Sequence, residues 1–90
     1  LGVFEVSHGS GSASLLQPRE VFMRLLLAGA SSFAIAHNHP SGDCTPSNQD
    51  IKITRIIKEA GKMMGIPIVE HIIAGNPGHY SFCAHGFFDN

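Results

Sequence analysis

Two histidines and one aspartate are spaced so that together they could hold a metal ion. His37 and His39 lie two residues apart at the end of an apolar segment that we expect to be a buried strand. In an extended backbone, side chains at i and i+2 point the same way, so both imidazoles can reach one point in space. Asp50 follows after a loop long enough to bring it back to the strand end. Two imidazoles and one carboxylate suit a tetrahedral zinc ion with one open position, which is typical of catalytic rather than structural zinc.

A hydrolytic zinc site also needs a general base to take a proton from water. Glu5 is the first candidate, because it lies on the first expected strand beside small residues that leave room for a substrate. Glu20 competes with it, but it stands in the first turn of an expected helix, where the helix dipole alone favours a carboxylate. Glu70 also competes, beside His71 on a later strand.

Asp50 has a second interpretation, which is purely structural. Ser47 and Asp50 fit a capping box, in which a serine and an acidic residue three positions later satisfy the free N–H groups at a helix start. We expect one carboxylate not to serve both as a cap and as a ligand, so the residues alone leave the two roles open. Cys44 is interpreted as an ordinary loop residue. The other histidines are expected at the surface, in turns or as supports for a ligand: His8, His71, His79 and His85.

Hydrophobic periodicity and turn residues predict the surrounding elements. We expect strands over residues 1–7, 32–37, 67–74 and 80–83, and helices over residues 18–28 and 47–64. This order predicts an α/β (α+β) domain with a small mixed sheet and two helices. The first helix is apolar nearly all round, so we expect it to be well buried.

Composition limits the remaining possibilities. The chain has 90 residues, of which 43% are hydrophobic and 14% charged, and its formal net charge is −1. That size allows one small domain, and the charge argues against an autonomous DNA-binding module. No apolar run approaches the roughly 20 residues that span a membrane. Two cysteines are too few for a disulfide framework, so a reducing, cytoplasmic setting is expected. A start without Met suggests a fragment of a longer protein.

The ligand candidates form part of a longer motif. His37-Asn38-His39-Pro40, Ser47 and Asp50 together read H-x-H-P-x6-S-x2-D. This pattern resembles the JAMM motif of the JAB/MPN metalloprotease superfamily. The stretch from Ala36 to Asp50 resembles the bacterial RadC family specifically, as do the segments 18–22 and 80–86. The resemblance covers nearly the whole chain.

The resemblance implies a role for each matched residue. His37, His39 and Asp50 match the zinc ligands of the family, Ser47 matches a serine that helps to hold the tetrahedral intermediate, and Glu5 matches the water-activating base. It also implies that residues 1–90 form a single RadC-like JAB/MPN domain, without the N-terminal helical segment of family members. The implied fold is a curved mixed sheet flanked by helices, similar to that of cytidine deaminases.

The function implied by the resemblance is zinc-dependent cleavage of peptide or isopeptide bonds in a peptide or protein substrate. The alternative is a non-catalytic interaction module of a RadC-type protein linked to DNA repair. Nucleoside deamination is disfavoured, because its H-x-E and P-C-x-x-C signatures are missing from the sequence. We expect neither direct nucleic-acid binding nor membrane binding by this domain, and a homo-oligomer is compatible with its composition.

Overall fold

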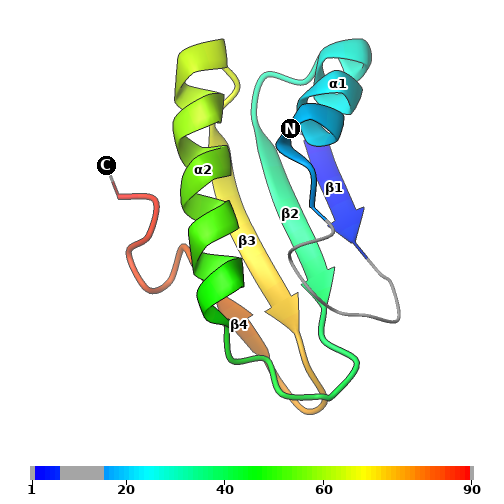
Figure 1. Cartoon of the computed structure of the whole chain (residues 1–90), viewed down its shortest axis with the longest axis vertical. Helices are drawn as coiled ribbons and strands as arrows, with labels where there is room; N and C mark the ends of the chain where they lie inside the picture. The colour runs from blue at the N-terminus through cyan, green and yellow to red at the C-terminus, as the bar shows by residue number, and fades with distance from the viewer. Residues whose placement is uncertain (1, 7–15, 90) are drawn as a thin grey trace.

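The computed structural model describes residues 2–6 and 16–89, and for residues 3–6 it describes the backbone alone. The described elements follow the predicted order within one or two residues at most boundaries (Figure 1). The strands are β1 (Gly2–Val6), β2 (Phe33–Asn38), β3 (Ile68–Ala74) and β4 (His79–Ser81), and the helices are α1 (Pro18–Ala28) and α2 (Asn48–Met64). The predicted α+β class is therefore confirmed.

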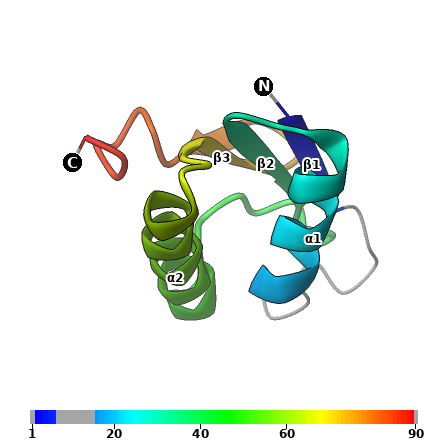
Figure 2. The same cartoon turned by 90° about the horizontal axis from the view of Figure 1, so that it is seen from above.

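The described strands form one mixed sheet in the order β1-β2-β3-β4. β1, β2 and β3 are parallel neighbours, and β4 runs antiparallel to β3. Each helix connects two adjacent parallel strands, and Figure 2 shows both helices on the same face of the sheet. The carboxyl ends of the parallel strands therefore meet at one edge of the sheet, and the loop from β2 to α2 starts there.

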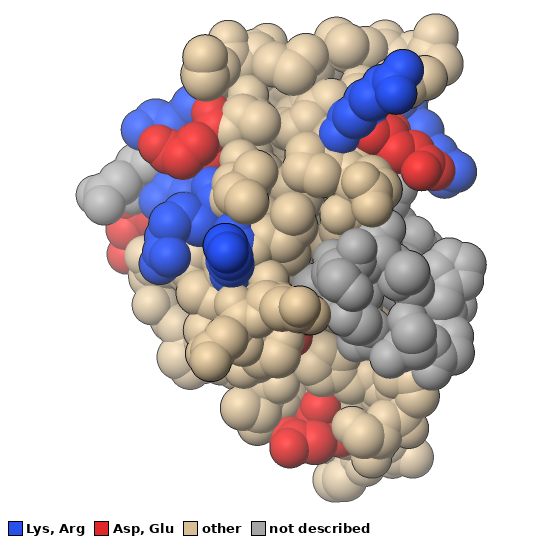
Figure 3. Space-filling view, in the orientation of Figure 1, with Lys and Arg blue, Asp and Glu red and all other residues tan. Residues whose placement is uncertain are grey.

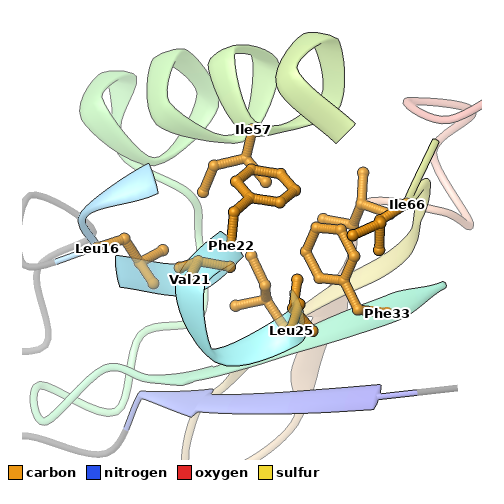
Figure 4. Packing of buried hydrophobic residues seen from close by; sticks show 9 residues of the cluster. Leu16, Val21, Phe22, Leu25, Phe33, Ile57 and Ile66 are labelled. Atoms are coloured by element: carbon orange, nitrogen blue, oxygen red, sulfur yellow. The ribbon is translucent and has the colours of Figure 1, made fainter. Parts of the chain in front are cut away.

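The hydrophobic core fills the space between this face of the sheet and the two helices (Figure 4). Phe22 of α1 meets Phe33 of β2 edge to face, with ring centroids 5.6 Å apart. Ile57 is the residue of α2 in this core cluster, and it is fully buried. The buried cluster consists of Leu16, Val21, Phe22, Leu25, Phe33, Ile35, Ile57, Ile66 and Ile68. This packing holds α2, and with it Asp50, against the sheet.

The expectation that the first helix is well buried was wrong. One face of α1 packs on the sheet, whereas Met23 and Leu26 are about half exposed and Leu27 is 87% exposed. A helix in a two-layer arrangement contacts the sheet with one face, and none of the other described elements covers the outer face of α1. None of the described helices is long and apolar enough to span a membrane.

A shift in strand register decides which residues of β3 face the core. Phe33 pairs with Ile68, but Ala34 pairs with Glu70, so Val69 is an extra residue in β3. A one-residue shift moves every following side chain to the other face of a sheet. Because of it, His71 pairs with Ile35 and lies on the face that the helices cover.

Candidate metal centre

The fold brings the three predicted ligands together. His37 is the penultimate residue of β2, His39 follows directly after the strand, and Asp50 lies in the first turn of α2. One potential ligand atom from each residue lies within 4.8 Å of those of the other two. His37 is 1% exposed and Asp50 is 0% exposed, whereas the side chain of His39 is 12% exposed. The group is therefore buried, and solvent approaches it from the side of His39.

Hydrogen bonds hold His39 in the orientation that a ligand needs. Its backbone N–H donates to Ala74 O at 3.1 Å, so the ladder between β2 and β3 continues one residue past the strand. Its ring Nδ1 lies 2.8 Å from Asp43 O. Because a carbonyl oxygen can only accept, Nδ1 carries the proton and donates it. This bond directs Nε2 toward Asp50 Oδ2 at 3.2 Å. A second bond of this kind commonly fixes the ring of a metal-binding histidine.

The short distance between His39 Nε2 and Asp50 Oδ2 requires a positive charge between these two atoms. With Nδ1 protonated, Nε2 of a neutral ring presents a lone pair, and so does the carboxylate oxygen 3.2 Å away. Two such atoms repel one another unless a proton or a metal ion lies between them. Nitrogen and carboxylate donors in this number fit zinc and other divalent transition metals. The residues present therefore fit a metal ion, and they leave its identity open.

Asp50 both caps the helix and faces the histidines. Its Oδ2 accepts from Ser47 N at 2.7 Å, and its backbone N–H donates to Ser47 Oγ at 3.0 Å, which completes the predicted capping box. Its Oδ1 lies 3.8 Å from His37 Nδ1. The cap therefore does not turn the carboxylate away from the histidines, because its two oxygens offer about four lone pairs. Its role as a metal ligand stays a prediction. Ser47 accepts the cap bond and keeps its hydroxyl proton to donate elsewhere.

Close backbone contact fixes the loop that follows His39. Asn76 N donates to Gly42 O at 2.8 Å, which joins this loop to the turn after β3. A Cβ atom on Gly75 would lie 2.5 Å from the same Gly42 oxygen. Gly42 itself has φ +86, in the region that glycine adopts most readily. Glycine is therefore needed at both positions for the loop to hold His39 where it is.

Thr54 and His71 lie behind the candidate ligands, and Thr54 was assigned no role from the sequence. Thr54 Oγ1 lies 2.6 Å from Asp50 O and 2.8 Å from His71 Nδ1. His71 is fully buried, stacks on Phe82 with ring centroids 4.6 Å apart, and lies 5.9 Å from the His37 ring. Of the expected places for His71, surface and turn were wrong, and support of a ligand agrees with these contacts. A polar residue amid the β-branched residues of β3 was the available signal.

The environment of His71 keeps its ring neutral. Burial and, to a smaller extent, the neighbouring His37 lower the pKa of His71 from 6.5 to about 4. The carboxylates of Asp50 and Glu70 act in the opposite direction and do not offset the burial. A neutral ring behind the ligand group adds no positive charge next to a metal ion.

The candidates for the general base have different surroundings. Glu5 lies in β1, where its backbone is paired with Ala36, one residue before His37. Its side chain lies outside the described part of the chain, so its role stays a prediction. Glu20 is exposed, pairs with Arg24 at 3.1 Å in the first turns of α1, and is not a member of the candidate metal group. His8 also lies outside the described residues.

The Glu70 carboxylate forms hydrogen bonds with the C-terminal part of the chain. Its Oε1 accepts from the backbone N–H groups of His71 and Cys83, at 2.8 and 3.0 Å, and its Oε2 accepts from Ser81 Oγ at 2.6 Å. Both oxygens therefore hold the turn after β4.

Cys44 is partly buried in the loop before α2. A Cβ atom added to Gly75 would lie 3.0 Å from the Cβ of Cys44.

A mixed sheet with a His-x-His pair at the end of one strand and an aspartate at the start of the next helix is typical of a JAB-type domain. The profile of the RadC-like JAB domain family matches residues 1–87, and the chain belongs to this family, as its motif predicted. A UPF0758 protein of Pelobacter propionicus is 48% identical over 82 residues, which are 91% of this chain and 36% of that protein. A UPF0758 protein of Clostridium botulinum is 45% identical over 87 residues, 97% of this chain and 38% of that protein. The chain thus spans little more than a third of the length of these relatives.

Proposed function

We propose that this domain is a zinc-dependent hydrolase that cleaves amide bonds in a peptide or isopeptide substrate. The observation that carries the proposal is the buried group of His37, His39 and Asp50, whose ligand atoms lie within 4.8 Å of one another. Membership of the RadC-like JAB family supports it. The partial exposure of His39 provides a side from which a substrate carbonyl can approach.

His37, His39 and Asp50 would hold the zinc ion. When bound, zinc supplies a Lewis acid that makes water nucleophilic near neutral pH. Glu5 acts in this proposal as the general base that takes the proton of the attacking water and passes it to the leaving amine. Ser47 donates its free hydroxyl proton toward the developing oxyanion, while its oxygen accepts the helix cap bond from Asp50.

A second candidate function is partner binding without catalysis. The exposed apolar side chains of Met23, Leu26 and Leu27 on α1 favour it, because contiguous apolar surface often marks a protein interface. A role in a DNA-repair complex, or self-association, would belong to this alternative. We also propose a cytoplasmic location with reduced thiols, since Cys44 and Cys83 are free.

Metal analysis of the purified protein tests the site. We expect about one zinc ion per chain, either after purification or after addition of zinc. His37→Ala and His39→Ala should each abolish tight binding, because two remaining ligands hold the ion poorly. His79→Ala is the matched control, since His79 is exposed on β4 and lies outside the ligand group. Stoichiometric zinc after loss of both His37 and His39 would rule out this site.

A hydrolysis assay then separates the two candidate functions. Peptide and isopeptide libraries should be cleaved by the zinc-loaded protein and left intact after chelation. Glu5→Gln should keep the zinc and lose cleavage, because an amide cannot accept the proton. If Glu5→Gln removes the zinc instead, Glu5 is a ligand and not the base. A zinc-loaded protein that cleaves no member of either library favours the binding module.

A further inference from the structure

We propose that Thr54 and His71 form a positioning pair that holds Asp50 in place opposite His37 and His39. This inference rests on the proposed metal site, and it assigns a role to two residues outside the ligand motif. Neither residue touches the reacting atoms in this proposal. They act through the backbone of Asp50, and their effect is therefore expected first on metal affinity.

The direction of each hydrogen bond in the pair follows from the groups involved. Asp50 O is a carbonyl oxygen and can only accept, so the Thr54 hydroxyl donates to it at 2.6 Å. That hydroxyl has a single proton, so at the 2.8 Å contact His71 Nδ1 must be the donor and Thr54 Oγ1 the acceptor. One chain of hydrogen bonds thus runs from β3 through the second turn of α2 to the backbone of Asp50.

This chain joins two of the elements that form the site, α2 and β3, and the His71 ring also lies near the third, β2. β2 carries His37, α2 carries Asp50, and β3 carries His71, whose ring is stacked on Phe82 at 4.6 Å and lies 5.9 Å from the His37 ring. Both His71 and Thr54 are fully buried, so neither can exchange its partner for water. The position of the first turn of α2 relative to the histidines is therefore fixed from β3.

The capping box alone leaves this position undetermined. Ser47 and Asp50 bond to each other within the same helix start, so they orient the carboxylate relative to α2. The bond between Thr54 and His71 instead ties α2 to the sheet, 17 residues along the chain. Removal of partners that orient metal ligands typically lowers metal affinity by about 10–100-fold.

The experiment compares Thr54→Val with Thr54→Ser in the full protein. Valine keeps the shape of threonine but has no hydroxyl, so His71 loses its acceptor and Asp50 O loses its side-chain donor while it keeps the backbone N–H of the helix. Serine keeps the hydroxyl. His71→Phe and His71→Asn form a second pair, because phenylalanine keeps the stacking ring without the donor, whereas the asparagine amide places an N–H near the position of Nδ1. Ile66→Val is the control, because it trims the buried core away from these hydrogen bonds.

Three measurements are made on each variant: zinc affinity by competition with a chelator, the absorption spectrum of the cobalt-substituted protein, and thermal unfolding without metal. We expect Thr54→Val and His71→Phe to lower zinc affinity by about 10–100-fold and to change the cobalt spectrum. Thr54→Ser and His71→Asn should stay within about threefold of the wild type. Ile66→Val should lower the unfolding temperature and leave zinc affinity and the spectrum unchanged.

The measurements distinguish failure of the positioning role from failure of the proposed function. If the wild type binds zinc and folded Thr54→Val binds it equally well, with the same cobalt spectrum, the positioning role is wrong and the metal site stands. If Ile66→Val loses affinity as strongly as Thr54→Val, the effect is one of general stability and the positioning role is again wrong. If the wild type binds neither zinc nor cobalt, the proposed function is wrong, and this inference falls with it.

Discussion

Ser47 and Asp50 hold each other by two reciprocal hydrogen bonds, from Ser47 N to Asp50 Oδ2 at 2.7 Å and from Asp50 N to Ser47 Oγ at 3.0 Å. The same bonds that begin α2 also aim the carboxylate, whose second oxygen is then left to face His37 at 3.8 Å. Helix capping and the orientation of the candidate ligand are therefore one arrangement. A ligand oriented before the metal arrives loses little further conformational freedom on binding.

Substitutions at Asp50 should separate these two roles. Asp50→Asn keeps an oxygen that can accept from Ser47 N but loses the charge, whereas Asp50→Ala loses both. We expect both variants to lower zinc affinity by more than the roughly 10–100-fold that is typical for loss of a residue that supports a ligand. Asp50→Ala should also lower the free energy of unfolding by about 1 kcal/mol more than Asp50→Asn, because it removes the cap. Chelator competition and urea unfolding measure the two effects.

Ser47→Ala provides the control for Asp50. It should cost about 0.5–2 kcal/mol of stability through the lost cap. It should keep most of the zinc affinity, because alanine keeps the backbone N–H that donates to Asp50 Oδ2. Wild-type zinc affinity in Asp50→Asn would show that the carboxylate is not a ligand.

Gly75→Ala should disturb the metal centre from a distance. The added Cβ would lie 2.5 Å from Gly42 O, so the loop after His39 must move. We expect a loss of about 1–3 kcal/mol in the free energy of unfolding, as for other overpacked sites, together with weaker zinc binding. Gly78→Ala is a comparison at the same turn, where no atom lies within 4 Å of the added Cβ but φ is +94. Equal zinc affinity in Gly75→Ala and the wild type would mean that the loop does not set the position of His39.

The buried His71 should make the metal-free protein less stable in mild acid. Its pKa is lowered from 6.5 to about 4 in the folded state, so between these values the unfolded chain binds the additional proton. The free energy of unfolding is therefore highest above about pH 6.5 and falls with decreasing pH, by at most about 1.4 kcal/mol per pH unit, until about pH 4. Urea unfolding at several pH values with chelator present measures this slope.

His71→Asn is the comparison for the acid effect, because asparagine does not titrate. His37, His39 and the nearby carboxylates are common to both proteins, so the difference in slope reports His71. An identical slope in the two proteins would show that His71 does not titrate below its usual range.

The domain should bind duplex DNA weakly or not at all at physiological salt. Non-specific affinity depends on the number of phosphates that basic side chains neutralise. Figure 3 shows the basic side chains in separate groups, with acidic neighbours beside them. Arg24 pairs with Glu20, and Lys58 Nζ donates to Phe87 O at 2.9 Å. The basic residues are Arg19, Arg24, Lys52, Arg55, Lys58 and Lys62.

Fluorescence anisotropy with a short duplex at several salt concentrations measures this DNA affinity. Micromolar or tighter binding near 0.15 M salt, with a steep salt dependence, would contradict the prediction. It would also favour a DNA-associated role for this domain.

The sequence alone indicated the elements and the candidate metal ligands, because both depend on neighbours along the chain. Helical periodicity and end signals placed α1 and α2, and Pro18 and Gly29 mark the two ends of α1 in the structure as in the prediction. The spacing of His37 and His39 at a strand end implies a shared direction for their rings whatever the rest of the fold. A motif of fourteen positions, from His37 to Asp50, was sufficient to identify the family.

The tertiary structure decided the features that depend on how elements pair. The extra residue at Val69 turns His71 toward the helices; in an unshifted register Glu70 would occupy that face. No local pattern shows such a shift, because side-chain alternation is the same in either register. The contact of His71 with Thr54 and the exposure of Leu27 likewise depend on which elements lie side by side. Periodicity identifies an apolar face, but the arrangement of layers decides what covers it.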